Sequence, residues 1–103
     1  MRDQLLAGLR ERIRRYTESG DRWAISTLEV DALVGPGTGF DAEAYHVAGT
    51  MYWLCYRAAT DREWPRTTEL ATALRLFGAV LDAGAPYDVP APLRLILECR
   101  RDP

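Results

Sequence analysis

Hydrophobic residues recur along most of the chain at intervals of three and four positions, which is the spacing of one face of an α-helix. The first such stripe lies in residues 2–20, a segment whose opposite face is rich in arginine and which ends at Gly20, a common helix stop. A second stripe follows at 21–34, with Asp21 as the expected N-cap. The predicted buried side of this second segment consists of Trp23, Ile25, Leu28, Ala32 and Leu33. Because the join is so short, the two segments predict an antiparallel helical hairpin.

The rest of the chain predicts a second hairpin and a short last helix. Residues 35–40, GPGTGF, form a loop because glycine and proline make up four of the six positions. A third helix is expected from Asp41 to about Ala59, and a fourth from Pro65 to Ala83 with Gly84 closing it. After a connector stiffened by proline, a fifth helix is expected with its inward side made of Leu93, Ile96 and Leu97.

These elements together predict the fold class and the domain organisation. No segment alternates hydrophobic and polar residues with a period of two over a useful length, so we expect an all-α protein of about five helices in antiparallel hairpins. A chain of 103 residues has the size of one domain. The predicted parts are hairpin 2–34, loop 35–40, hairpin 41–84 and a C-terminal capping helix at 90–101.

The segment at 44–59, AYHVAGTMYWLCYRAA, contains the chain's one histidine and one of its two cysteines. It is apolar on nearly all sides, which predicts a helix buried between neighbouring helices. His46 and Cys55 are nine residues apart, about 14 Å along a helix, so they cannot act as a base and nucleophile pair. Cys55 is expected in the core. His46 is expected to be partly exposed and bonded to a carboxylate or water, or else to contact a partner in a pH-dependent way.

Composition narrows the possible functions without choosing one. Hydrophobic residues at 48% and charged residues at 27% are normal for a globular protein, and a net charge of −2 gives no overall attraction to nucleic acid or an anionic membrane. No apolar run approaches the ~20 residues of a membrane span, so we expect a cytoplasmic protein with no membrane partner. Two cysteines are too few for a disulfide framework or a zinc site.

No catalytic motif emerges from the sequence. Paired histidine and glutamate spacings, a nucleophile elbow and a phosphate-binding loop are all missing, and GPGTGF lacks both the preceding strand and the lysine of a phosphate loop. We therefore predict a protein that is not an enzyme, with no cofactor and no metal.

When the sequence is aligned with itself at an offset of 41 residues, Ala7-Gly8 aligns with Ala48-Gly49. Each pair lies in a predicted amphipathic helix, so the two segments are candidates for an internal repeat. With the helix that follows each pair, this pattern resembles degenerate tetratricopeptide-like helical hairpins. In that family, small residues in the first helix let the neighbouring helix approach closely, and the first helices line a groove that holds a peptide or a partner helix. A plain bundle of four or five helices is the alternative.

The resemblance implies a set of partner-binding residues on the groove side: His46, Thr50, Trp53 and Arg57 of the third segment and Arg12 of the first. The four residues of the third segment fall on one helical face. For Trp53, burial against the first or second segment is the structural alternative.

Three hypotheses of function follow. The leading one is a non-catalytic module that binds another protein or peptide, or its own copy as a homodimer, with the fifth helix as a cap on the fourth or as a dimer contact. The second is a small ligand-binding accessory protein or enzyme, with a pocket lined by Tyr45, His46, Tyr52, Trp53 and Arg57. The third, a nucleic-acid binder using the arginine-rich first segment, is disfavoured because Glu11 and Glu18 interleave with those arginines.

Overall fold

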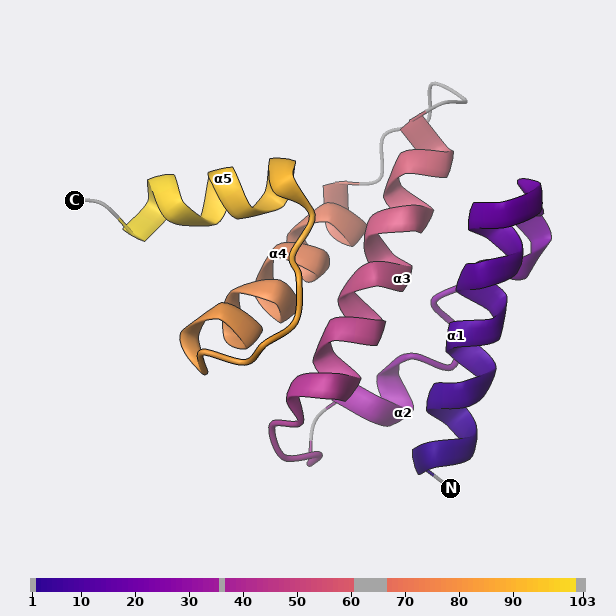
Figure 1. Cartoon of the computed structure of the whole chain (residues 1–103), viewed down its shortest axis with the longest axis horizontal. Coiled ribbons are helices and arrows are strands. Elements are labelled where there is room, and N and C mark those ends of the chain that lie inside the picture. Colours follow the sequence, from indigo (N-terminus) through magenta and orange to yellow (C-terminus); the bar gives the residue numbers. More distant parts are fainter. Residues whose placement is uncertain (1, 36, 61–66, 102–103) are drawn as a thin grey trace.

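The computed structural model describes residues 2–35, 37–60 and 67–101, and within these ranges the chain is helical with no strand (Figure 1). The elements in chain order are α1 (Arg2–Ser19), the 3₁₀ turn η1 (Arg22–Ala24), α2 (Asp31–Val34), α3 (Ala42–Thr60), α4 (Thr67–Asp82) and α5 (Ala91–Arg101). The all-α prediction, with about five helices in a small bundle, is confirmed. The predicted start of the fourth helix, Pro65, lies outside the described residues.

Helix α3 is the centre of the fold. It packs most extensively against α4 on one side and contacts α1 and α2 on the other, as Figure 1 shows, while α5 contacts the outer side of α4. The buried residues of α3 point in several directions around the helix: Ala44, Val47, Ala48, Met51, Leu54 and Cys55. The sequence prediction that residues 44–59 form a helix enclosed by other helices is therefore confirmed, and Cys55 lies in the core as expected.

The buried residues divide into two clusters. The first lies between α1, α2 and α3 and includes Leu76 of α4, and the second lies between α4, α5 and the connector at 85–90. Partly buried Tyr52 borders both clusters from its position on α3. The second cluster consists of Ala73, Leu74, Phe77, Val89, Leu93 and Leu97.

The predicted helix ends agree with the local hydrogen bonds. The Asp41 carboxylate accepts a hydrogen bond from the Ala44 backbone N–H at 3.2 Å, so Asp41 caps α3 as expected. At the end of α4, Gly84 has a φ of +66° and the Ala85 N–H donates to the Val80 carbonyl at 3.3 Å. This is the bond pattern of a Schellman C-terminal motif, which favours glycine because φ is positive.

The prediction of one helix over residues 21–34 is wrong. Only η1 and the four residues of α2 are helical there, and the chain between them is extended and then turns. Ile25, Ser26 and Thr27 explain the break, because β-branched residues and serine favour the helix weakly. Ser26 Oγ accepts a hydrogen bond from the Leu28 N–H at 3.2 Å, a local bond that competes with helix formation.

The altered backbone reverses the predicted burial in this segment. Trp23, Leu28 and Ala32, expected on the buried side, are exposed, whereas Val30 and Val34 lie in the core. A smaller correction applies to α5, where Leu93 and Leu97 face inward as predicted but Ile96 is exposed.

The small residues that suggested a repeat occupy different environments. Ala7 and Gly8 are exposed, and no atom lies within 4 Å of where a Gly8 side chain would begin. Ala48 and Gly49 are buried, and the Phe77 ring of α4 lies directly on Gly49. The close approach predicted for this position is thus present on α3 but not on α1, and the described residues give no evidence of tetratricopeptide-like repeats.

Candidate functional site

Two large hydrophobic side chains are almost fully exposed on the segment between α1 and α2. Trp23 is 92% exposed and Leu28 is 90% exposed. Single exposed leucines are common on protein surfaces, but a fully exposed tryptophan is unusual, since tryptophan is highly buried on average. We call residues 22–28, with these two side chains, the Trp23–Leu28 surface.

The backbone under the Trp23–Leu28 surface is fastened to the rest of the protein. The Asp21 carboxylate accepts a hydrogen bond from the Trp23 N–H at 3.1 Å, and Arg12 Nε of α1 donates to the Ala24 carbonyl at 2.8 Å. Ala24 is only 3% exposed. The two hydrophobic side chains therefore project from a segment that is held in place on its inner side.

Arg12 is the predicted partner-binding residue that the structure connects to this surface. Its side chain is 23% exposed, and besides the Ala24 carbonyl it reaches Glu29 at 3.7 Å. Both contacts are to the segment that leads into α2. Arg12 therefore positions the Trp23–Leu28 surface and is separated from the other four predicted residues, which all lie on α3.

His46 attaches α3 to the connector between α4 and α5. Its Nε2 lies 2.7 Å from the Asp88 backbone carbonyl, and because a carbonyl can only accept, Nε2 carries the proton and donates. The ring stacks on Tyr87 with centroids 5.2 Å apart and meets Phe77 edge-on. The partner of His46 is thus a backbone carbonyl, where the sequence suggested a carboxylate or water.

The remaining predicted residues of α3 form contacts within the chain. The Thr50 hydroxyl donates to the His46 carbonyl at 2.8 Å. Trp53 is partly buried against the second hydrophobic cluster, and the Arg57 guanidinium lies 5.8 Å from its ring centre, a cation–π distance. Trp53 also stacks on Tyr56. These residues lie on one side of α3, as their spacing in the helix requires. Each of them already makes a hydrogen bond or a ring contact with another residue of the chain.

A cleft of about 420 Å³ opens between α2, the following loop, α3 and α4. Its lining combines two opposite charges, a phenol, a hydroxyl and glycine backbone: Asp31, Val34, Gly35, Gly37, Thr38, Tyr45 and Arg75. Of the pocket residues predicted from the sequence, Tyr45 lines this cleft, while His46 and Trp53 pack toward the second cluster. Asp31 and Arg75 carried no signal in the sequence, because each resembles an ordinary charged residue on a helix.

Contacts with neighbouring side chains hold two residues of the cleft, Asp31 and Tyr45, in place. The Tyr52 hydroxyl donates to Asp31 Oδ1 at 3.1 Å, and the pKa of Tyr52 is raised, first by burial and then by this bond to a carboxylate. The Tyr45 ring is held edge-on by Phe40, with ring centres 4.8 Å apart. Arg75 is exposed, and no carboxylate among the described residues forms an ion pair with it.

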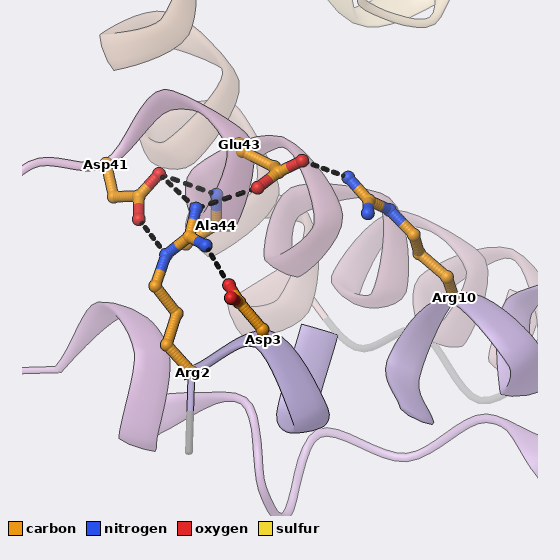
Figure 2. A network of polar contacts seen from close by, with 6 residues as sticks. All are labelled: Arg2, Asp3, Arg10, Asp41, Glu43 and Ala44. Carbon is orange, nitrogen blue, oxygen red and sulfur yellow. Dashed lines mark hydrogen bonds and ion pairs between the residues drawn. The ribbon is translucent and has the colours of Figure 1, made fainter. Parts of the chain in front are cut away.

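A network of charges joins the start of α1 to the start of α3 (Figure 2). Arg2 binds Asp41 at 2.5 Å, Glu43 at 2.7 Å and its neighbour Asp3, and Arg10 binds Glu43 at 2.6 Å. Hydrogen bonds from these arginines lower the pKa of Asp41 and Glu43, and the carboxylates raise the pKa of Arg2.

The same kind of pairing accounts for much of the arginine-rich face of α1. Arg10 is bonded to Glu43, and Arg14 is bonded to Glu11 and Glu18 of its own helix. Arg12 also contacts an acceptor within the chain, so Arg10, Arg12 and Arg14 of the arginine-rich first segment are all bonded inside the protein. The network has a structural role, because each of its bonds closes on another residue of the protein.

In the described ranges, no helix is long and apolar enough to cross a membrane, and no group of three or more histidine, cysteine, aspartate or glutamate side chains is placed to hold a metal ion. Comparison of the chain with protein families, with curated proteins and with solved structures gives no match.

Proposed function

We propose that this protein is a non-catalytic interaction module that binds another protein through the Trp23–Leu28 surface. The observation that carries the proposal is a tryptophan 92% exposed and a leucine 90% exposed on a backbone held from within by Arg12 and Asp21. Tryptophan, with tyrosine and arginine, is enriched among the side chains that dominate binding energies at protein interfaces.

The size of the exposed groups supports this assignment. Burial of a tryptophan side chain removes about 200 Å² from water, which corresponds to about 5 kcal/mol of gross hydrophobic free energy before the costs of association. Leaving such a side chain in water gives the folded monomer no comparable benefit. The partner expected from this chemistry is a protein with an apolar pocket that accepts the indole ring and a shallower apolar contact for Leu28.

Preorganisation is the second supporting argument. A side chain on a loose loop loses conformational entropy when it binds, whereas in the Trp23–Leu28 surface the N–H groups of both exposed residues and the carbonyl of Ala24 are already hydrogen-bonded. Arg12 is the main positioning residue, because it joins this segment to α1 by a charge-assisted hydrogen bond at 2.8 Å.

The experiment is affinity capture from an extract of the cells that make the protein, followed by a binding titration with the captured partner. Trp23→Ser and Leu28→Ser are the test variants, and Leu95→Ser, on α5 and 63% exposed, is the matched control. We expect Trp23→Ser to weaken binding by at least about 30-fold, which corresponds to about 2 kcal/mol, and Leu95→Ser to have no effect. Arg12→Met is expected to weaken binding less and to accelerate amide exchange at residues 24–30.

Self-association is measured on the same samples by sedimentation velocity over a range of concentrations. A dimer that Trp23→Ser abolishes would mean that the partner is a second copy of this chain. The proposal is wrong if Trp23→Ser and Leu28→Ser retain the same partners, with the same affinities, as the unsubstituted protein. The three serine variants should remain folded, because substitutions at exposed positions usually change stability by less than about 0.5 kcal/mol. Arg12 is partly buried, so the folded state of Arg12→Met is checked by its circular dichroism spectrum before binding is measured.

A further inference from the structure

We propose that the cleft between α2 and α4 is a binding site for a small zwitterion, a molecule of amino-acid size that carries one anionic and one cationic group. This site is separate from the Trp23–Leu28 surface and does not depend on the function proposed above. The geometry that points to it is the placement of Asp31 and Arg75 in the lining of one cleft without an ion pair between them.

The two charged residues reach the cleft from different elements. Asp31 is the first residue of α2, and Arg75 lies in the middle of α4. An arginine and an aspartate that share a cleft would ordinarily close on each other, since they attract and a bidentate pair is favourable. Here no ion pair joins them, so both charged groups remain able to bind a third molecule.

Bonds already made in the structure keep the aspartate in place. Asp31 Oδ1 accepts the hydrogen bond from the Tyr52 hydroxyl of α3 at 3.1 Å. The second carboxylate oxygen, Oδ2, remains available to accept a hydrogen bond from an ammonium group. The Arg75 guanidinium supplies N–H donors in a planar arrangement that suits a carboxylate.

Opposite charges in one cleft select the ligand class. A simple anion drawn to Arg75 would be repelled by Asp31, and a simple cation drawn to Asp31 would be repelled by Arg75. Only a molecule that carries both charges, separated to match the cleft, gains from both residues at once. The held Tyr45 ring adds an apolar wall for the carbon atoms between the two charged groups.

The size of the cleft sets the size of the ligand. Its volume of about 420 Å³ lies near the lower end of the range for small-molecule sites, about 300–1,000 Å³. This is room for an amino acid or a short ω-amino acid rather than for a nucleotide. The charges are solvent-exposed, so binding is expected to be weak and to weaken further as salt is added.

The test is a titration of the ¹⁵N-labelled full chain, followed by amide chemical shifts at low ionic strength. Glycine, β-alanine and 4-aminobutanoate carry the same two charges at increasing separation, and acetate and methylammonium each carry only one of them. We expect saturable shifts at residues 31–35, 37, 38 and 45 with at least one zwitterion, and at least about tenfold weaker binding of acetate and methylammonium.

Substitutions then connect the binding to the cleft. Arg75→Gln and Asp31→Asn are each expected to weaken the best zwitterion by about tenfold, the effect of losing one charge-assisted hydrogen bond. Asparagine keeps an acceptor for Tyr52, so the shape of the cleft is preserved. Arg94→Gln, on α5 and outside the cleft, is the matched control and should bind like the unsubstituted protein.

Three results would overturn the proposal. One is the absence of any saturable shift up to about 100 mM of all three zwitterions. Another is acetate or methylammonium binding as tightly as the best zwitterion. The third is unchanged binding in both Arg75→Gln and Asp31→Asn. Each variant's own amide spectrum reports whether it is folded, and Trp23→Ser, which alters the other surface, should bind the zwitterion normally.

Discussion

Gly49→Ala tests a close contact between α3 and α4 in the core. A Cβ atom at Gly49 would lie 3.1 Å from Cε1 and Cζ of Phe77 and 3.2 Å from its Cε2. Ordinary contacts of this kind begin at about 3.4 Å, so the ring or the helix must move by a few tenths of an ångström. Phe77 is fully buried and its ring lies edge-on to His46, so a shift of the ring disturbs neighbours that are already packed.

Two effects of opposite sign determine the magnitude. Alanine in place of glycine inside a helix stabilises it by about 1 kcal/mol. Overpacking a well-filled core costs about 1–3 kcal/mol. Because the Phe77 ring is fully buried and also contacts His46, we expect the second effect to prevail, with a net loss of about 1 kcal/mol in the free energy of unfolding.

Gly8→Ala is the matched control, because Gly8 also lies inside a helix but has no atom within 4 Å of its Cβ position. Gly8→Ala should gain only the helix propensity of alanine, about 1 kcal/mol, whereas Gly49→Ala is expected to lose about 1 kcal/mol. The free energies of unfolding of the two variants should therefore differ by about 2 kcal/mol. Urea unfolding gives the free energies directly, and thermal melts should separate by several degrees, since about 1 kcal/mol shifts the Tm of a domain this size by about 4–8 °C.

A double-mutant cycle identifies the cause. In the Phe77→Leu background the ring is gone, so Gly49→Ala should become neutral or stabilising. The reasoning is refuted if Gly49→Ala is as stabilising as Gly8→Ala in the unsubstituted protein, or if its cost persists unchanged when Phe77 is leucine.

Three further predictions use the remaining structure. The pKa of Asp41 is lowered in the folded chain, so ionised Asp41 stabilises the folded state. This stabilisation should be complete above the unfolded-state pKa of about 4 and be lost as the pH falls through the folded pKa. Asp41→Asn should therefore flatten this part of an acid-unfolding curve measured by circular dichroism. Removal of the ring in His46→Ala breaks the hydrogen bond to the Asp88 carbonyl, so amide exchange at Ala85, Tyr87, Asp88 and Val89 should accelerate while that of α1 is unchanged. Equal acceleration in both places would contradict the assigned role of His46. A thiol reagent should modify exposed Cys99 at once and buried Cys55 only on unfolding; rapid loss of both thiols in the native protein would show that the core opens.

The sequence predicted most of the helical framework because that framework depends on local patterns. Asp41, Gly20 and Gly84 mark helix ends through hydrogen bonds and dihedral angles that lie within a few residues of each of them. The burial of residues 44–59 was also predictable, since a helix that is apolar on nearly all sides has to be covered.

The segment at 21–34 could not be predicted in the same way. Its hydrophobic spacing fits a helix, but local bonds at Ser26 and the anchoring of Ala24 by Arg12 favour a different backbone. This change turned Trp23 and Leu28 outward and so produced the proposed contact surface. A periodicity argument assumes a helix before it assigns a face, and it assigns the wrong face when the helix is absent.

By itself, the sequence determined that this protein is a small helical bundle with one enclosed central helix, because the spacing of apolar residues along the chain indicates which segments are helical and which sides are buried. Only the tertiary structure decided which polar side chains lie close together and which hydrophobic side chains are exposed. Asp31 and Arg75 are 44 positions apart and come to one cleft through the packing of α2, α3 and α4. Contacts between distant residues depend on how the helices cross, and no local pattern records that arrangement.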